Sequence, residues 1–433
     1  MGAEPLKSCP TIGVLPDGWQ VKSLDSFCTK IGTGATPRGG SEVYLNARLG
    51  HALIRSQNVF DRHFDTTGLA FISDIHTNEL RSAEVKSGDV LLNITGDGVT
   101  FARSCIVPDH VLPACVNQHV SIIRTDRQEC DPGYLLAVLT HPAAKIYIES
   151  FNAGGSRRAI TKGNIESFKI ALPPLAVQEA IARVLGALDD KIELSRRMNE
   201  TLEALAQSLF KSWFADATQS GLPKGWCECT LGDVIEVKHG FAYQGEFFRD
   251  EQCRDILLTP GNFAIGGGFK EDKLKYYDGP TPDEYLLSEG DLLVTMTDLS
   301  KAGDTLGYGA ILPAAPDGHR FHHNQRLGKV LIRDSCVVNK PFLYQILRSH
   351  EYRAEILGSA TGTTVKHTSP GRIKSFKFDL PPKQLMQEFG NVAGAWHELA
   401  LHNRKESRTL AALRDALLPK LLSGELRVPA IEN

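Results

Sequence analysis

The chain has 433 residues, a length that predicts two or three domains rather than one core. Its content of 42% hydrophobic and 23% charged residues is typical of a folded globular protein, and its apolar runs are too short for a membrane span. The 48 basic and 51 acidic residues leave a net charge near zero, so any contact with nucleic acid must come from local basic patches.

The beginning of the chain and its cysteines predict the compartment. The first residues, MGAEPLKSCPTIG, lack the charged and apolar regions of a signal peptide, and the nine cysteines are scattered and odd in number. We therefore expect a cytoplasmic protein with reduced thiols and without a membrane partner. Cys227 and Cys229 form a C-x-C pair that no second ligand pair follows at metal-binding spacing, so no metal site is predicted.

Several phrases occur twice along the chain, about 207 residues apart. The clearest pairs are LPDGWQVKSLDS (15–26) with LPKGWCECTLGD (222–233), SGDVLLNITGD (87–97) with SEGDLLVTMTD (288–298), and IESFKIALPP (165–174) with IKSFKFDLPP (373–382). Between these phrases the two halves diverge, and residues 34–85 share almost nothing with residues 241–286. The chain is therefore predicted to be a duplication whose two copies are related by a pseudo-two-fold axis.

Each copy is predicted to be a mixed domain in which sheet dominates, followed by a long helix. Apolar runs such as DVLLNI, VSIIRT and DLLVTM have strand length, and glycine and proline separate them. The fold class is thus α+β. The predicted segments are a first domain at 1–172, its helix at 173–219, a second domain at 220–380, and a second helix with a tail at 381–433.

The two helical segments carry the same heptad spacing, at an offset of 208. The predicted apolar seam consists of Ile181, Val184, Leu188, Met198, Leu202, Leu205 and Leu209 in the first helix, and of Phe389, Val392, Trp396, Leu410, Leu413 and Leu417 in the second. Sustained heptads in two matched copies favour pairing of the two helices, whereas the alternative is a separate surface helix on each domain. The polar residues Lys191, Ser195, Asn403 and Glu406 interrupt the seam and could fix its register.

The sequence contains no motif of a known active site. It lacks a phosphate-binding P-loop, a G-x-S-x-G nucleophile elbow and an H-E-x-x-H zinc motif. The segment RFHHNQR holds His319, His322 and His323, but no acidic or cysteine partner stands at a useful spacing. No catalytic, cofactor-binding or metal-binding residue is predicted, and a recognition or assembly protein is expected.

The repeated phrases together resemble a known family. They are LP-x-GW, GD-[VL]-L before a glycine-rich turn, NQ, LPP, and the helices ALDDKIELSRRMNETLEALAQSLFKSWF and RTLAALRDALLPKLLSGEL. Over essentially the whole chain they resemble the DNA-specificity (S) subunit of type I restriction–modification systems. The resemblance implies two target-recognition domains, each of which reads one half of a bipartite asymmetric DNA sequence. It also implies that the two helices form an antiparallel coiled coil that holds the domains apart.

The same resemblance implies the partners. The subunit would be non-catalytic and would bind double-stranded DNA and two methyltransferase (M) subunits, which would recruit restriction (R) subunits. S-adenosylmethionine, ATP and Mg would then belong to the partner subunits, and this chain would hold no cofactor. Two alternatives stay open: the recognition subunit of another restriction or methylation architecture, and a two-domain scaffold that binds a protein or a polysaccharide.

Three places in each half have the residue types that contact DNA. The first holds Arg55, Gln57 and Asn58, with Asn262 as the partner in the second half; the alternative is an Asx turn. The second is a set of basic residues after a glycine, namely Arg157, Arg158 and Lys162, and Lys366 and His367 in the second half. The third is the turn after GD-x-L, with Thr95 and Arg103, and Thr297 and Lys301 in the second half. The pairs Asn117–Gln118 and Asn324–Gln325 are interpreted as structural turns.

Overall fold

A computed structural model of the chain describes residues 8–45, 47–152, 157–271, 274–333 and 337–429. The chain divides into two compact units, Met1–Leu194 with Arg408–Asn433, and Ser195–Ser407. This division cuts the long helices α5 (Leu175–Phe210) and α10 (Lys383–Leu422), so that each unit contains part of both. Among the described helices, none is long and apolar enough to cross a membrane.

The first unit is built around an antiparallel sheet with the strand order β12-β10-β14-β4. Its strands are β12 (Ser104–Ile106), β10 (Val90–Asn93), β14 (Val120–Thr125) and β4 (Cys28–Thr33). Side chains alternate between the two faces of a strand, and both faces of this sheet are buried. Leu92 and Ile123 thus join one apolar cluster, whereas Leu91 and Ile122 join another.

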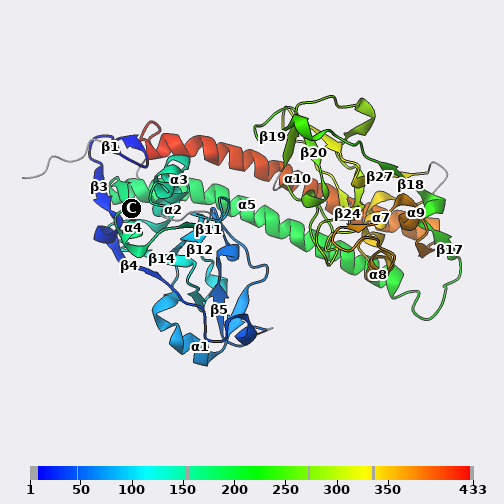
Figure 1. Cartoon of the computed structure of the whole chain (residues 1–433), viewed down its shortest axis with the longest axis horizontal. Helices are drawn as coiled ribbons and strands as arrows, with labels where there is room; N and C mark the ends of the chain where they lie inside the picture. Colours follow the sequence, from blue (N-terminus) through cyan, green and yellow to red (C-terminus); the bar gives the residue numbers. More distant parts are fainter. Residues whose placement is uncertain (1–7, 46, 153–156, 272–273, 334–336, 430–433) are drawn as a thin grey trace, which may run out of the picture. The chain divides into compact units, whose positions relative to one another are not determined.

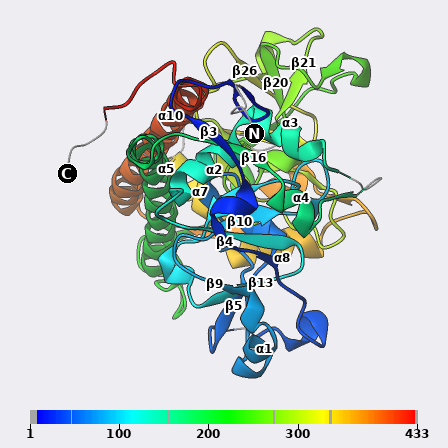
Figure 2. The same ribbon diagram turned by 90° about the vertical axis from the view of Figure 1, so that its left-hand side faces the viewer.

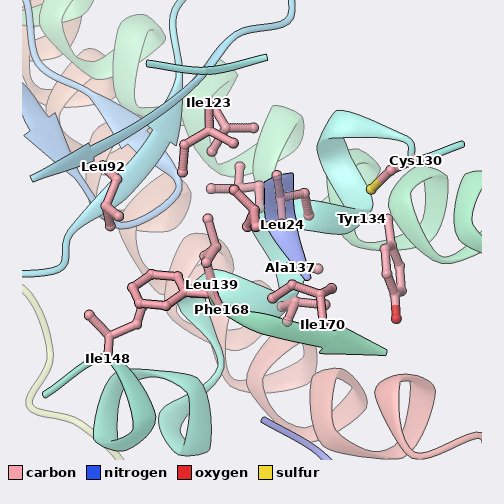
Figure 3. Close-up of a cluster of buried hydrophobic side chains, with 14 of the residues drawn as sticks. Leu24, Leu92, Ile123, Cys130, Tyr134, Ala137, Leu139, Ile148, Phe168 and Ile170 are labelled. Carbon is pink, nitrogen blue, oxygen red and sulfur yellow. The ribbon is translucent and has the colours of Figure 1, made fainter. Parts of the chain in front are cut away.

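Helices cover one face of this sheet and a second sheet covers the other (Figures 1 and 2). The helical side includes α2 (Pro132–Thr140), α3 (Pro142–Glu149) and part of α5. Figure 3 shows Tyr134 and Leu139 of α2 in one cluster with Leu92 and Ile123 of the sheet. The second sheet has the order β8-β5-β13-β9, and its pair β5–β13 is parallel. Its strands are β8 (Ala70–Ile72), β5 (His51–Ile54), β13 (Ala114–Val116) and β9 (Glu84–Val85).

The second unit repeats this arrangement. Its antiparallel sheet β18-β27-β23-β25 consists of β18 (Ile235–His239), β27 (Leu327–Ile332), β23 (Leu292–Thr295) and β25 (Gly309–Ile311). Its other sheet, β19-β21-β20-β26-β22, consists of β19 (Phe248–Arg249), β21 (Lys275–Tyr277), β20 (Asp255–Leu258), β26 (Arg320–His323) and β22 (Leu286–Leu287). The pair β20–β26 is parallel, as β5–β13 is in the first unit. The predicted α+β duplication is therefore confirmed.

The repeated phrases at the two ends of each half pair with each other. In the first unit, β3 (Gln20–Ser23) from the LP-x-GW phrase is antiparallel to β16 (Lys169–Leu172) from the LPP phrase. In the second unit, β17 (Cys227–Thr230) and β29 (Lys377–Leu380) form the same pair. In both units the prolines end the strand and a long helix begins directly afterwards, because proline cannot donate to a sheet. The repeat thus encodes the two strands that close each domain.

Three short helices recur in matching places: α2, α3 and α4 (Lys162–Glu166) of the first unit correspond to α7 (Lys340–Ile346), α8 (His350–Gly358) and α9 (Pro370–Lys374) of the second. Helices α1 (Asp74–Glu79) and α6 (Leu231–Val234) have no α-helical counterpart in the other unit among the described residues. Helices α2 and α7 are buried against their central sheets. Helix α2 begins with Pro132 after the Asp131 cap, and α7 has Pro341 as its second residue after the Asn339 cap. A π-turn at Lys211–Ala215 follows α5 and places Phe214 in the core of the second unit.

The long helices pair in antiparallel fashion within each unit. In the first unit, Arg414 of α10 forms an ion pair of 2.8 Å with Asp189 of α5. In the second unit, Asn403 donates a hydrogen bond of 2.9 Å to Asn199, and the ring of Phe389 lies 6.0 Å from that of Phe210. The partner number on α10 falls as the position on α5 rises, which is the sign of an antiparallel pair.

Nine of the thirteen predicted seam residues are buried or partly buried, and the other four are exposed. Ile181, Leu188, Leu202, Leu209, Phe389, Trp396, Leu410 and Leu417 are buried or partly buried, and Val184 packs against the first core. By contrast, Met198, Leu205, Val392 and Leu413 are 39%, 46%, 38% and 47% exposed. Their places inside the pair are taken by the next residues along the helix, Asn199, Ala206, Ala393 and Arg414. The prediction failed there because it selected large apolar side chains, whereas these positions use small or polar ones.

Candidate nucleic-acid interface

A short two-stranded ribbon joins two of the three predicted DNA-contacting places in each unit. In the first unit, β11 (Thr95–Gly96) from the turn after GD-x-L pairs with β15 (Arg158–Ala159) from the basic segment. In the second unit, β24 (Thr297–Asp298) pairs with β28 (Lys366–His367) in the same way. The second and third predicted places are therefore one site per unit, which we call the basic ribbon. The sequence did not predict this pairing, because about 60 residues separate the two strands in each half.

The turn of the first basic ribbon is tightly constrained. The carboxylate of Asp97 accepts hydrogen bonds from the hydroxyl and the backbone N–H of Thr100 and from the N–H of Val99. These bonds, with Thr100 first, lower the pKa of Asp97 to about 2, so the side chain is ionised at neutral pH. A Cβ on Gly96 would lie only 2.3 Å from the Thr100 hydroxyl, so the turn has no room for another residue there.

The basic side chains of the first ribbon differ in their freedom. Arg157 is exposed, directly before β15. Arg158 forms an ion pair of 2.5 Å with Glu149, and its guanidinium would lie 2.3 Å from a Cβ on Gly98. Lys162, at the start of α4, is exposed and forms an ion pair of 3.3 Å with Glu166 one turn later. Arg157 is thus the cation of this group that is best placed for a phosphate.

The second basic ribbon has the same backbone and different side chains. Burial raises the pKa of Asp298, but hydrogen bonds from Ser300 and Thr305 lower it more, so Asp298 organises this turn as Asp97 does in the first unit. The hydroxyl of Thr297 lies 3.1 Å from Nδ1 of His367 across the ribbon. His367 is exposed, Lys366 is partly exposed, and Lys301 is exposed in the turn after β24.

The Asn-Gln turn lies beside the ribbon in both units. The N–H of Ile94 donates to the carbonyl of His119, at 3.0 Å, and the N–H of Met296 donates to the carbonyl of Arg326, at 2.8 Å. In each turn the asparagine side chain accepts the N–H two residues later, at 3.0 Å in both cases. Asn117 and Asn324 are 7% and 8% exposed, so the structural interpretation of the asparagines is confirmed.

The glutamines of this turn and the residues after them were missed by the sequence prediction. Gln118 is exposed in the first unit, and Gln325 and Arg326 are exposed in the second. Because Gln is a residue type that reads base edges, these side chains join the candidate interface. The signal that could have found them is the pattern itself, a constant Asn-Gln followed by a residue that differs between the halves.

His119 is held between the turn and the ribbon. Its Nδ1 lies 2.7 Å from the Thr95 hydroxyl, and its Nε2 lies 3.2 Å from Nε2 of Gln118. The hydroxyl of Thr36 donates in turn to the side-chain oxygen of Gln118. Burial and the nearby charge of Arg157 lower the pKa of His119, so its imidazole is neutral at physiological pH.

The first predicted place is corrected at its two asparagines. Asn58 and Asn262 are fully buried, and their side-chain oxygens accept the N–H groups of Arg55 and Thr259, at 3.1 and 2.9 Å. The amide of Asn58 also donates to the carbonyl of Asp65, at 2.9 Å. These bonds use the polar atoms that a base would need. Each asparagine accepts the N–H three residues before it and so closes a capping box over a short 3-10 turn, Ser56–Asn58 or Pro260–Asn262. The role is structural, but it is not the Asx turn of the alternative interpretation.

The remaining predicted residues lie around these turns. The Arg55 guanidinium donates to the carbonyl of Gly68 and lies 5.4 Å from the ring centre of Tyr44, while Gln57 is exposed and donates to the same carbonyl at 3.5 Å. Arg103 is partly exposed and lies 4.4 Å above the ring of Phe60. Gln57 is the exposed residue among these three, whereas Arg55 and Arg103 are partly exposed and lie over aromatic rings.

Residues 16–204 match the family model described as "Type I restriction modification DNA specificity domain". The match covers less than half of the chain. The whole chain is also similar to the type I restriction enzyme MjaIX specificity subunit of Methanocaldococcus jannaschii, with 24% identity over 96% of this chain and 95% of the relative. A second relative is the type I restriction enzyme HindI specificity subunit of Haemophilus influenzae, with 22% identity over 88% of this chain and 95% of the relative.

A solved structure supports the fold independently. The chain superposes on the type I restriction–modification S subunit of M. genitalium with a TM-score of 0.55 and 14% identity, over 98% of this chain and 100% of the other. The family model and the relatives confirm the resemblance to type I specificity subunits that the repeated phrases predicted, and the superposition supports the fold alone.

Proposed function

We propose that the chain is the specificity subunit of a type I restriction–modification complex and that each unit reads one half of a bipartite, asymmetric DNA target. The observation that carries this proposal is the basic ribbon with its Asn-Gln turn, built once in each unit on equivalent strands. The backbone is the same in both, but the side chains beside it differ. Two different readers on one scaffold are what an asymmetric target with two half-sites requires.

The side chains of the two sites fit duplex DNA. Arg157 and Lys366 supply the positive charge that phosphates bind, and Gln118, Gln325 and Arg326 are of the types that make paired hydrogen bonds with base edges. These positive charges are concentrated at the two sites, although the net charge of the whole chain is −3. Partner subunits would then supply part of the phosphate neutralisation that a DNA-bound complex needs.

The proposal assigns the helices two further tasks, which are to set the spacing between the half-sites and to dock two methyltransferase subunits. Leu205 and Leu413 are equivalent residues of α5 and α10, and they are 46% and 47% exposed. Ala204 and Ala412 beside them are also exposed in both copies. One apolar surface repeated with identical residues suits a partner that is present twice. Catalysis, and with it S-adenosylmethionine, ATP and Mg, belongs to the methyltransferase and restriction subunits in this proposal.

A domain exchange tests the division of labour. Residues 34–160 run from directly after β4 to directly after β15 and contain the first interface except Lys162. Replacing them with the same region of a related specificity subunit should change one half of the methylated motif, mapped by sequencing modified bases in a host that also expresses the partner subunits. The matched exchange of residues 240–368 should change only the other half. A change of both half-sites by either exchange would contradict independent reading.

A further inference from the structure

We propose that the residue after the Asn-Gln pair, His119 in the first unit and Arg326 in the second, determines which base its unit prefers. The glutamines before it, Gln118 and Gln325, contact a DNA feature that both half-sites share. This inference rests on the proposed function, because it names the residues that distinguish the two readers.

The two Asn-Gln turns present the glutamine and the residue after it from the same backbone positions. In each unit the buried asparagine fixes the turn, and the third residue is tied by its carbonyl to the strand that leads into the basic ribbon. A glycine directly after the first strand of each central sheet, Gly34 after β4 and Gly240 after β18, lies against the backbone where the turn begins. A Cβ on Gly34 would lie 1.6 Å from the carbonyl oxygen of Val116, and one on Gly240 would lie 2.2 Å from that of Asn324. The place of the side chain is thus set by the scaffold and not by its own identity.

The residue after the Asn-Gln pair differs in chemistry between the units, and so do the residues that contact it. In the first unit, Thr95 binds His119 from the turn. In the second unit the equivalent Thr297 binds His367, which stands on the other strand of the ribbon at the position of Ala159. The histidine that bonds this threonine thus stands in the turn in one unit and on the ribbon in the other, and position 326 holds an exposed arginine without a side-chain partner among the described residues.

His119 and Arg326 can make different hydrogen bonds with the edge of a base. A neutral imidazole whose ring nitrogens contact Thr95 and Gln118 can offer a base only single hydrogen bonds, after those contacts exchange. An arginine offers a rigid fork that binds O6 and N7 of guanine together. The two units therefore differ in base-reading chemistry at one equivalent point, next to a charged ribbon.

The glutamine that both turns share still has hydrogen-bonding groups available for DNA. The amide of Gln118 donates one N–H toward His119 and accepts one bond from Thr36, so one N–H and one lone pair stay available. A side chain that is identical in both readers cannot distinguish two different half-sites. It can hold the sugar–phosphate backbone, which both half-sites contain.

A reciprocal exchange tests the inference. His119→Arg copies the second turn into the first unit, and Arg326→His does the reverse. Each variant is expressed with the partner subunits, and its motif is mapped by sequencing modified bases. We expect each variant to change base preference by about 5- to 150-fold at one or two positions of a single half-site, with guanine favoured by His119→Arg, because a good base contact discriminates by that much. Unchanged motifs at full methylation in both variants would overturn the assignment.

Gln118→Ala tests the other half of the proposal. It should weaken binding of the complex to its own target duplex by about 10-fold or more without changing the motif, since a shared contact is lost. A motif relaxed at one position of the first half-site alone would instead make Gln118 a discriminating residue and contradict the shared role. Thermal unfolding controls for folding, and Arg326→His carries the test if His119→Arg does not fold, because Arg326 is exposed. A wild-type complex that yields no bipartite motif at all would refute the proposed function rather than this assignment.

Discussion

Asn403 of α10 donates a hydrogen bond of 2.9 Å to the side-chain oxygen of Asn199 on α5, inside the helix pair of the second unit. Asn403 is 5% exposed, and the amide of Asn199 donates further to the carbonyl of Ala400, at 3.3 Å. Leu202 and Ala400, one turn away on the two helices, are apolar and partly or fully buried. A buried polar pair in such a seam is satisfied in one register only, so it fixes the register at a cost in stability.

Breaking this pair should be more costly than removing it. Asn403→Ala leaves the partly buried side-chain oxygen of Asn199 without its donor, and we expect a loss of about 1–3 kcal/mol in the stability of the second unit. The double variant Asn199→Ala with Asn403→Ala should lose less than the sum of the two single variants. Amide hydrogen exchange along α10 in the second unit measures each value. Strictly additive losses would show that the two side chains do not interact.

The repeated phrases made the fold predictable, because each phrase encodes a strand or a helix whose pattern survives in both copies. The heptads also predicted paired helices. The seam, however, depends on Asn199 and Ala206 rather than on Met198 and Leu205, and hydrophobic spacing cannot select an asparagine over a methionine. The register of the pair is fixed by contacts between the two helices, and the spacing of residues within each helix does not reveal these contacts.

The candidate interface was predictable only as separate pieces. Thr95 and Arg158 were both named from local composition, but only the antiparallel pairing of β11 with β15 brings them together. Asn58 is of a residue type that reads bases, but its role is structural, and only its burial distinguishes the two roles. Gln118 was passed over because its neighbour Asn117 is structural. Which side of a turn faces solvent is decided by tertiary packing and not by the residue types.

Arg157 and Arg158 should differ in their effect on DNA binding, although they are adjacent. Arg157 is exposed, so Arg157→Ala should weaken binding to every sequence and reduce the slope of log affinity against log salt by up to about one. Arg158→Ala should have a smaller effect, because Glu149 already neutralises this guanidinium. Titrations of the complex with cognate and unrelated duplexes at several salt concentrations measure both. The control Glu149→Ala should release Arg158 and strengthen binding; a changed motif in Arg157→Ala would mean that Arg157 reads bases.

The second unit should lose stability in mild acid through His397 of α10. Burial, with the nearby charges of Arg404 and Lys340, lowers the pKa of His397 to about 4. Between about pH 6.5 and 4 the unfolded chain binds a proton at this histidine that the folded unit does not bind, so stability falls as the pH falls through this range. The loss attributable to this group is at most about 3 kcal/mol.

The variant His397→Leu isolates this contribution. It cannot take up the proton, so its second unit should lose less stability than wild type between pH 7.5 and pH 4.5. Urea unfolding followed by hydrogen exchange in α7 and α10 at the two pH values gives the difference, while the first unit serves as an internal control. Parallel losses in wild type and variant would show that His397 titrates normally in the folded state.

The helices should set the number of unspecified base pairs between the two half-sites. One heptad can be inserted after Leu194 in α5 and one after Ser407 in α10, where the two unit boundaries fall. In an antiparallel pair in which Asn199 contacts Asn403, these insertion points lie opposite each other, so the seam stays in register. Seven residues lengthen a helix by about 10 Å. The same length of duplex holds about three base pairs, since a turn of about 10 pairs spans about 34 Å.

We therefore expect the double insertion to lengthen the spacer by about one to three base pairs and to leave both half-site sequences unchanged. Binding should weaken, because three base pairs also turn the second half-site by roughly 100° about the duplex, and the supercoil of the helices compensates only part of this rotation. Sequencing of modified bases reads the spacer directly in wild type and variant. The control is a single insertion in α5, which shifts the seam against α10 and should abolish methylation. An active double insert that keeps the wild-type spacer would show that another element, or a partner subunit, sets the separation of the half-sites.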